Sequence, residues 1–335
     1  MLKIGIFNDT SRNGHFGCLA VMSTIISQLE RRNAKIKFLW PLNNDWTKHK
    51  NYIESQKLDL IIINGEGTIH HTKNSNKVKL LLQIVNFSKK INIPAFLINS
   101  TIYDVDDESI KLLKLFAKIY VRETSTQKYL SIKGVPSEMV PDLSFFTPFL
   151  DEHAEKEHRN KFLFTDSVKR DVSQKLKNIS EHLNSEFISM LPKKQSFLTY
   201  FIKRINSKPP IYFLPKLSKP TNYRNLVSFL NKLKKTKLTI TGRFHTVTLA
   251  LATYTPIIAI ESNTPKISYI LMDIFGDTKR IKTISDIDSF NATNEIEYKY
   301  TSEEKNKLST YMISGRVKLD VMFDDILEIT ITSEK

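Results

Sequence analysis

The sequence contains one cysteine, Cys18, among its 335 residues. A single cysteine excludes an internal disulfide and any zinc site built from several cysteines, and it is typical of a reducing compartment. The chain also has no apolar run near the roughly 18–20 residues that cross a bilayer. Its first residues, MLKIGIFND, are typical of a strand and not of a secretory signal peptide. We therefore expect a cytoplasmic protein that is soluble or attached to a membrane surface.

Acidic residues are missing from one long stretch. No Asp or Glu occurs between Glu186 and Glu261, whereas basic residues stay frequent there and the net charge of the chain is +15. One-sided charge raises the local concentration of anionic partners. A phosphorylated small molecule and an anionic membrane are the candidates, and solvated surface lysines account for part of the charge. No stacking motif or zinc module accompanies the basic residues, so we expect no nucleic-acid partner.

Secondary structure is expected to alternate regularly. Hydrophobic residues make up 41% of the chain, which suffices for real cores. Apolar runs predict strands at residues 3–7, 35–40, 58–63, 95–98, 119–121, 138–140, 161–164, 187–190, 211–214, 238–241 and 257–260. Helical spacing predicts helices at residues 18–31, 78–87, 109–117, 124–132, 170–182, 222–234, 245–252, 266–275 and 305–328. This alternation predicts an α/β fold with doubly wound sheets.

The length indicates two domains. A chain of 335 residues is long for one domain and comfortable for two of about 150 residues each. The charge-rich segment 149–160 is the expected linker, so we place one Rossmann-like domain at residues 1–150 and a second at 160–290. Residues 300–330 are expected to form closing helices. Two Rossmann-like domains that face a cleft form the arrangement of the GT-B glycosyltransferases and their relatives.

The strongest functional candidates follow the expected strand at 238–241. This strand ends at Gly242, Arg243 and His245 follow, and a helix rich in small residues begins at once. Glycine lets the backbone approach a ligand closely, and a helix start offers free N–H groups. Arg243 can bind a carboxylate or phosphate through two parallel hydrogen bonds, and His245 can donate or accept a proton. A salt-bridged arginine and a helix-capping histidine are the structural alternative.

Several segments together resemble one family. Gly-Arg-Phe-His at residues 242–245 precedes an alanine-rich helix, and Lys266 opens the next helix. The order of these and earlier segments is similar to that in the polysaccharide pyruvyltransferase family. The earlier segments are Gly-His-Phe-Gly-Cys-Leu-Ala at 14–20, Asn-Gly-Glu-Gly-Thr at 64–68, Val-Arg-Glu-Thr-Ser at 121–125 and Val-Pro-Asp at 140–142. Three residues depart from the usual pattern of that family: His15 replaces a frequent asparagine, Cys18 replaces a usual aspartate, and Glu66 interrupts a glycine-rich turn.

The resemblance implies a transferase that sets the enolpyruvyl unit of phosphoenolpyruvate across two sugar hydroxyls as a ketal and releases phosphate. The implied acceptor is an intermediate of a cell-surface polysaccharide or a lipid-linked saccharide, and no cofactor or metal ion is expected. His245 would act as general acid and later as base, while Arg243 and Arg122 would bind anionic groups. The candidate donor-binding residues are Arg122, Gly242, Glu261, Ser262, Asn263 and Lys266, and the candidate acceptor-binding residues are His15, Gly65, Glu66 and His70.

Residues 261–266 favour a second interpretation. In a GT-B domain, a carboxylate at this kind of strand end often holds a ribose. Glu261, Ser262 and Asn263 therefore also indicate a glycosyltransferase that uses a nucleotide-activated sugar, such as a CMP-linked acidic sugar. A helix cap at residues 262–264, followed by Pro265, is the structural alternative. A non-catalytic saccharide-binding protein with the same fold is a third interpretation.

One segment has the composition of a membrane anchor. Residues 191–205 combine basic ends with an aromatic and apolar centre that includes Phe197 and Phe201. Core packing and insertion into one leaflet of an anionic membrane both explain this pattern. An anchor would suit a lipid-linked acceptor at the inner face of the cytoplasmic membrane.

Overall fold

The described strands fall into two groups along the chain. A computed structural model describes the chain except for residues 42–43, 151–158, 191–219, 289–297 and 334–335. The first group is β1 Lys3–Phe7, β2 Lys35–Trp40, β3 Leu60–Glu66, β4 Ala95–Ser100, β5 Lys118–Val121 and β6 Glu138–Met139. The second group is β7 Lys161–Ser167, β8 Glu186–Ile188, β9 Thr236–Gly242 and β10 Ile257–Ala259.

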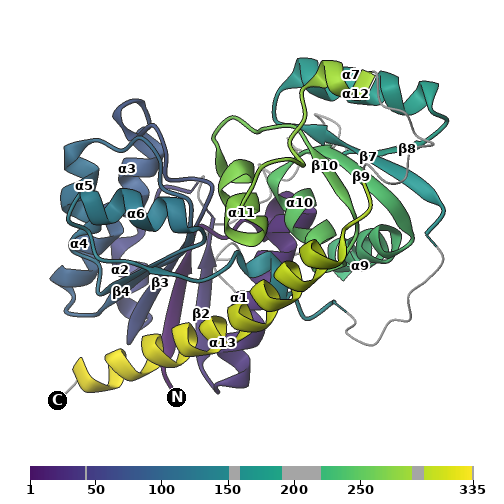
Figure 1. Cartoon of the computed structure of the whole chain (residues 1–335). Helices are drawn as coiled ribbons and strands as arrows, with labels where there is room; N and C mark the ends of the chain where they lie inside the picture. Colours follow the sequence, from purple (N-terminus) through teal and green to yellow (C-terminus); the bar gives the residue numbers. More distant parts are fainter. Residues whose placement is uncertain (42–43, 151–158, 191–219, 289–297, 334–335) are drawn as a thin grey trace, which may run out of the picture.

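Each group forms its own parallel sheet. Within the described residues, the first sheet has the order β2-β1-β3-β4-β5-β6 and the second has the order β10-β9-β7-β8 (Figure 1). Neighbouring strands are parallel throughout. In each sheet the strand that comes first in the sequence, β1 or β7, has a neighbour on both sides, so the chain winds first in one direction and then in the other. Both sheets are therefore doubly wound. The predicted α/β fold class is confirmed.

Helices connect the strands and cover the sheets. They are α1 Phe16–Arg31, α2 Lys50–Ser55, α3 Asn76–Leu82, α4 Ile84–Lys90, α5 Asp107–Leu113, α6 Thr124–Ile132, α7 Arg170–His182, α9 Pro220–Lys234, α10 Phe244–Ala252, α11 Lys266–Phe275, α12 Ile284–Asp288 and α13 Ser302–Ser333. Short 3-10 turns occur at η1 Ser11–Asn13, η2 Trp46–His49, η3 Thr72–Asn74 and η4 Leu143–Phe146.

Strand β3 shows how the sequence builds a central strand. Leu60, Ile61, Ile62 and Ile63 are all 0% exposed. Leu60 and Ile62 belong to the apolar cluster that contains α1, whereas Ile61 and Ile63 belong to the cluster on the opposite face. A strand with apolar residues at every position therefore suits a sheet that is covered on both sides.

One predicted helix differs from the structure, and other predicted segments lie wholly or mostly outside the described residues. The single helix expected at 78–87 is two helices, α3 and α4, because the carbonyl of Gln83 accepts hydrogen bonds from the N–H groups of both Asn86 and Phe87 in a tighter turn. The strand expected at 211–214 and the anchor segment at 191–205 lie outside the described residues. Most of the expected linker at 149–160 also lies outside them.

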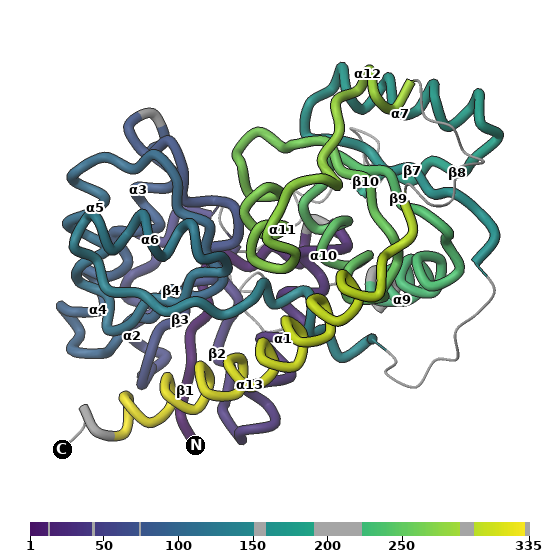
Figure 2. The backbone as a smooth tube through the Cα atoms, in the orientation of Figure 1, coloured from purple at the N-terminus to yellow at the C-terminus, as the bar shows by residue number. Residues whose placement is uncertain are grey.

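The two halves meet through helices. Helix α1 contacts α9 and α10 of the second half, and η4 packs against α10. The trace in Figure 2 shows α10 and α11 on the side of the second half that faces the first sheet. Hydrogen bonds cross this boundary between the hydroxyls of Ser144 and Thr248, which lie 2.7 Å apart, and from the N–H of Thr124 to Asp273 Oδ2 at 2.8 Å. The surface between the halves is therefore formed by the helices that follow β1 and β9.

The last helix, α13, ties both halves together (Figure 1). It contacts α11 of the second half and α1 of the first. Arg32 Nε donates to Asp324 Oδ1 at 2.6 Å, and Tyr120 Oη donates to Asp325 Oδ2 at 3.1 Å. The apolar side of the helix is anchored by Phe323, which is 0% exposed. The closing helix expected near residues 305–328 is thus one long helix. In the described part of the chain, no helix combines the length and hydrophobicity needed to cross a bilayer.

We expect Phe323→Ala to lower the free energy of unfolding by about 3–5 kcal/mol, because it empties a buried aromatic site in the shared core. Val321→Ala in the same helix is the control, since Val321 is 50% exposed. Its effect should stay below about 0.5 kcal/mol. Urea denaturation measures both values, and equal losses in the two variants would show that α13 does not pack through Phe323.

Candidate active site

In both sheets, the strand ends at which the winding direction changes lie near one region of the molecule. In open parallel sheets, ligands bind beyond the carboxyl ends of the strands at the point where the winding direction changes. This point lies between β1 and β3 in the first sheet and between β7 and β9 in the second. His15, at the start of α1, is close enough to Arg243, Asp166 and Lys266 of the second half for their charges to act on it. The candidate site therefore lies between the two halves.

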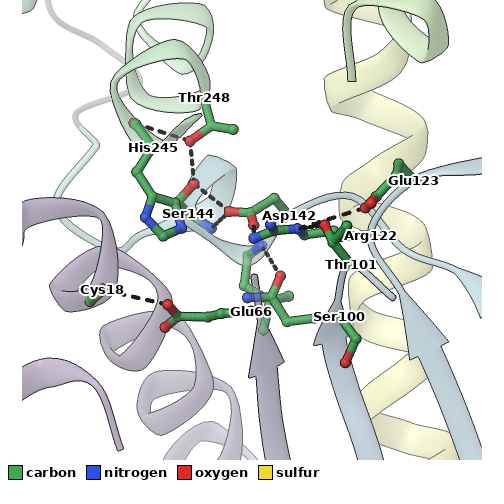
Figure 3. A network of polar contacts seen from close by, with 12 residues as sticks. Cys18, Glu66, Ser100, Thr101, Arg122, Glu123, Asp142, Ser144, His245 and Thr248 are labelled. Carbon is green, nitrogen blue, oxygen red and sulfur yellow. Dashed lines mark hydrogen bonds and ion pairs between the residues drawn. The ribbon is translucent and has the colours of Figure 1, made fainter. Parts of the chain in front are cut away.

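Arg122 follows β5 and is buried in this region. Its side chain is 1% exposed, its Nε donates to Thr101 Oγ1 at 2.7 Å, and its Nη1 donates to Asp142 Oδ2 at 2.8 Å (Figure 3). The guanidinium carbon lies 4.0 Å from the ring centroid of Phe244 in α10. Because a buried charge is costly without partners, the ion pair with Asp142 is what permits Arg122 to occupy this position. The predicted anion-binding side chain is thus held rigidly.

Gly67 faces two cationic nitrogens. A Cβ at Gly67 would lie 3.3 Å from Arg122 Nη2 and 3.5 Å from Lys266 Nζ, so a small group can sit between the two cations. Lys266 is the first residue of α11, and its Nζ donates to Asn263 Oδ1 at 3.3 Å. Burial, followed by repulsion from Arg122, lowers the pKa of Lys266 to about 8. Lys266 therefore still carries most of its positive charge at pH 7.

Arg243 is paired inside the protein. Its Nε donates to Asp166 Oδ1 at 3.0 Å and its Nη2 donates to Asp166 Oδ2 at 2.8 Å. Asp166 lies in β7, next to β9, and also accepts a hydrogen bond from the backbone N–H of Met190 at 3.1 Å. The two-bond contact that the sequence predicts for a substrate anion is therefore made by Asp166. The structural alternative, a salt-bridged arginine, is what the structure shows.

Two predicted ligand-contacting glycines allow strands to approach each other. A Cβ at Gly242 would lie 2.5 Å from Ser167 Cβ of β7, and a Cβ at Gly65 would overlap the side chain of Ser100 in β4. This packing explains why both positions are glycine, and donor contact at Gly242 and acceptor contact at Gly65 stay predictions. The glycines are needed because neighbouring strand ends crowd these positions.

Glu66 ends β3 in an unusual backbone conformation. Its φ is 43°, in the left-handed region that favours glycine. Its carboxylate accepts hydrogen bonds from Thr10 Oγ1, from Asn64 Nδ2 at 3.0 Å and from Cys18 Sγ at 3.4 Å (Figure 3). Glu66 is 6% exposed, and burial raises its pKa. Its carboxylate is held inside this buried cluster, and the acceptor role predicted for Glu66 stays a prediction.

Glu261 caps the start of α11. Its Oε2 accepts from the N–H of Ser268 at 3.0 Å, and its Oε1 accepts from the N–H of Ser262 at 2.8 Å. The N–H of Ser268 lies in the first turn of α11, where N–H groups have no partner within the helix. The alternative with a cap at residues 262–264 and Pro265 at the first helical position is not what the structure shows, because Pro265 precedes the helix and Glu261 caps it. The donor role of Glu261 stays a prediction. Ser262 is buried, and Asn263 is exposed beside Lys266.

His245 lies in the first turn of α10, where it is 9% exposed. Within the described residues its Nε2 has no hydrogen-bond partner. A Cβ at Gly17 would lie 2.5 Å from His245 Nδ1, so the histidine ring rests directly on the backbone of α1. Burial, followed by the charges of His15 and Arg122, lowers the pKa of His245 well below its ordinary value. The predicted general acid is therefore neutral at pH 7 in the free site.

The two predicted acceptor histidines lie in different surroundings. The ring of His15 is 5.5 Å from that of His245 by centroids, and burial, followed by Arg243, lowers the pKa of His15 to about 4. His70 forms a backbone bridge with Tyr103. Burial, followed by neighbouring charges that include Lys266, lowers the pKa of His70. His15 thus joins His245, whereas His70 lies near Lys266.

Sequence reasoning does not identify several residues of the site. Gly17 and Gly67 have no charged or nucleophilic group to mark them. Asp166 carries a usable signal, a carboxylate at the end of a strand, but its pairing with Arg243 requires that β7 lie beside β9. Glu123 is 1% exposed, and burial raises its pKa to about 7. Its place next to Arg122 in the sequence could have pointed to a second buried carboxyl.

The family model for polysaccharide pyruvyl transferase matches residues 15–264. The chain belongs to this family. The match begins at His15 and includes Glu66, Arg122 and His245, so it covers both halves of the candidate site. Membership of the family makes the chain a transferase and confirms the predicted resemblance. No curated protein matches the sequence.

Solved structures share the fold of this family member at low sequence identity. The UDP-GlcNAc 2-epimerase of Methanocaldococcus jannaschii, in complex with UDP-GlcNAc and UDP, is 12% identical with a TM-score of 0.52, over 93% of this chain and 99% of that one. The S. aureus MnaA–UDP co-structure is 12% identical with a TM-score of 0.52, over 89% and 90%. An uncharacterized Klebsiella pneumoniae protein is 14% identical with a TM-score of 0.50, over 84% and 93%. These similarities support the GT-B-like fold.

The lowered pKa values of His15 and His245 predict a loss of stability in acid. Unfolded histidine has a pKa of about 6.5. As the pH falls from about 6.5 to about 4, the pKa of His15, the unfolded chain binds protons that the folded site does not, so the free energy of unfolding falls. In urea denaturation across this window, His15→Gln should give a shallower fall than the parent. His182→Gln, at an exposed position, should keep the parent slope. The same slope in all three proteins would refute the assignment.

Proposed function

We propose that the protein transfers the enolpyruvyl unit of phosphoenolpyruvate to two hydroxyls of a saccharide. Both hydroxyl oxygens bond to C2 of the donor, one hydroxyl proton moves to the methylene carbon C3, and phosphate leaves with the other proton. The product is a pyruvate ketal. Membership of the polysaccharide pyruvyl transferase family supports the transferred group and the class of acceptor. The observation that carries the choice of donor is the pair of cations at Gly67.

The donor has two anionic groups, a phosphate and a carboxylate, and each requires compensation in a buried site. Arg122 Nη2 and Lys266 Nζ both lie close to Gly67, and one anionic group of the donor would bind these two cations. Arg122 is fixed by Thr101 and Asp142 and therefore loses little conformational freedom on binding. Such fixed charges stabilise a leaving phosphate without reorganisation during the reaction.

His245 is the proposed proton carrier. In the free site it is a neutral imidazole, because burial and nearby cations lower its pKa. A neutral imidazole can take the proton of the first acceptor hydroxyl. The bound donor offsets the charges of Arg122 and Lys266, so the imidazole holds this proton more strongly and can then deliver it to C3. His245 thus acts first as base and then as acid, the reverse of the order predicted from the sequence.

A glycosyltransferase that uses a nucleotide-activated sugar is the second candidate. Its supporting observation is that two solved structures with a similar fold are complexes with UDP. The internal hydrogen bonds of Glu261 argue against a glycosyltransferase, because the carboxylate that would hold a ribose caps α11. A non-catalytic saccharide-binding protein would need neither the cations at Gly67 nor a proton carrier.

The acceptor and the location are also part of the proposal. A lipid-linked saccharide at the inner face of the cytoplasmic membrane fits an enzyme of polysaccharide assembly. The basic stretch between Glu186 and Glu261 would favour an anionic membrane surface. Its centre, residues 191–219, lies outside the described residues, so the support comes from the sequence.

The donor is tested by thermal denaturation with phosphoenolpyruvate, CMP, UDP and GDP. A ligand that binds the folded state alone raises the melting temperature. We expect phosphoenolpyruvate to raise it and the three nucleotides to leave it unchanged. A rise with a nucleotide and none with phosphoenolpyruvate would favour the glycosyltransferase instead. No rise with any of the four would favour the saccharide-binding protein.

The contribution of Lys266 is tested by the pH dependence of donor binding. Lys266 loses its proton as the pH rises through about 8, so the dissociation constant of phosphoenolpyruvate should increase roughly tenfold between pH 7 and pH 9. Phosphate monoesters have their second pKa near 6, so the donor charge is constant in this range. Lys266→Arg should abolish the dependence, because arginine stays protonated. Lys305→Arg, at an exposed position of α13, should retain it. Calorimetric titration that gives parallel curves for all three proteins would contradict the role of Lys266.

A further inference from the structure

Three metal-binding side chains meet where α1 contacts α10. The sulfur of Cys18 and one ring nitrogen each from His15 and His245 lie within 4.8 Å of one another. His15 is the residue that precedes α1, and Cys18 lies in the first turn of that helix. Gly17, between them, leaves the space in which the ring of His245 approaches. The cluster therefore has two ligands from the first half and one from the second.

The nitrogens of this cluster lack hydrogen-bond partners. In the described part of the chain, His245 Nε2 and His15 Nδ1 are both buried and unpaired. His245 is 9% exposed, so water does not replace the missing partner freely. Leaving such a buried polar atom unpaired costs about 1–3 kcal/mol. A bound electrophile that accepts their lone pairs would remove this cost, whereas a purely structural pair of histidines would be expected to hydrogen-bond.

The charges near the cluster are compatible with a bound cation. Arg122, Arg243 and Lys266 all act on His245, and the two arginines are each ion-paired with a buried aspartate, which reduces their repulsion of a cation. Lys266 remains as an opposing positive charge. Glu66 Oε2 lies 3.4 Å from Cys18 Sγ. The carboxylate of Glu66 and a thiolate at Cys18 would together balance the two positive charges of a divalent ion.

We propose that His15, Cys18 and His245 bind one divalent metal ion of the kind that prefers nitrogen and sulfur ligands, with Zn²⁺ as the main candidate. Zinc binds these atoms at about 2.0–2.3 Å, which separates tetrahedral ligands by roughly 3.5 Å, so small side-chain rotations bring the three atoms to one ion. Binding replaces the thiol proton, which passes to water. The fourth position stays open to water or to another ligand.

The sequence predicts no metal site, because the three ligands come from distant parts of the chain. His15 and Cys18 form a short motif at the start of one helix, and the third ligand lies in the other half of the chain. A metal ion that takes the lone pair of His245 would leave this histidine unable to carry a proton, so the metal-bound form is distinct from the catalytic form proposed above. The proposal does not depend on pyruvyl transfer, because metal binding is measured without donor or acceptor. Failure of the phosphoenolpyruvate experiments would therefore leave it intact.

Cobalt titration of the full chain, without an affinity tag, tests the site. Co²⁺ is a spectroscopic substitute for Zn²⁺, and a cobalt–thiolate bond gives a charge-transfer band. Because the chain has one cysteine, such a band can come from Cys18 alone. We expect the band to saturate at one Co²⁺ per chain and to disappear when Zn²⁺ is added. Absence of a thiolate band at saturating Co²⁺ would overturn the proposal.

Variants identify the other ligands. Cys18→Ser should abolish the band, and His15→Gln should weaken Co²⁺ binding at least tenfold. His182→Gln, which removes an exposed histidine of α7, should leave the titration unchanged. If His15→Gln binds Co²⁺ as tightly as the parent, the assigned ligand set is wrong. Circular dichroism checks folding of each variant. A test on the parent needs no variant: Zn²⁺ should slow alkylation of Cys18 at least tenfold, and an unchanged rate would also overturn the site.

Discussion

The buried guanidinium of Arg122 is the constraint on which the rest of the site depends. A positive charge with 1% exposure is tolerated only where ion pairs and hydrogen bonds replace water. Thr101 and Asp142 supply them, and Asp142 also accepts a hydrogen bond from Ser144 at 2.5 Å. The hydroxyl of Ser144 in turn contacts Thr248 of α10 (Figure 3). A single network thus extends from the first sheet into the second half and fixes α10, which carries His245.

Charge balance explains which groups of the site remain open to a substrate. Arg243 is matched by Asp166, and Arg122 is largely matched by Asp142. Among the described residues, Lys266 has no carboxylate within ion-pair distance, and burial lowers its pKa to about 8. The net positive charge that remains lies at Gly67, and it adds to the effect of burial, which is the main cause of the lowered pKa of His245. The arrangement therefore favours an anionic ligand whose arrival changes the protonation of the histidine.

The sequence predicts the elements of this fold better than the partners of its side chains. The strand expected at 35–40 and the helices expected at 124–132 and 266–275 coincide with β2, α6 and α11, because hydrophobic periodicity is a local property. The ion pair of Arg243 with Asp166 is not local. It exists because β7 lies beside β9, although β8 intervenes in the sequence.

For the site residues too, the sequence predicts their positions better than their partners. His245 and Lys266 are predicted at helix starts that follow strand ends, and the structure brings both to the boundary between the halves. Gly65 and Gly242 stand at strand ends in the sequence as predicted, yet their missing side chains make room for Ser100 and Ser167. A sequence pattern shows that a position must lack a side chain, but it does not show what fills the space.

The contact between Gly17 and His245 has a consequence for how this protein can change over generations. Any side chain at position 17 would strike the histidine ring, because a Cβ there would lie 2.5 Å from its Nδ1. Position 17 must lack a side chain because this histidine lies opposite, and the histidine can keep its position only while residue 17 is glycine. A chimaera that joins one half of this chain to the other half of a relative would lose the site unless both parents carried the matching residues. The two halves must therefore carry matching residues at this contact, although each sheet is wound separately.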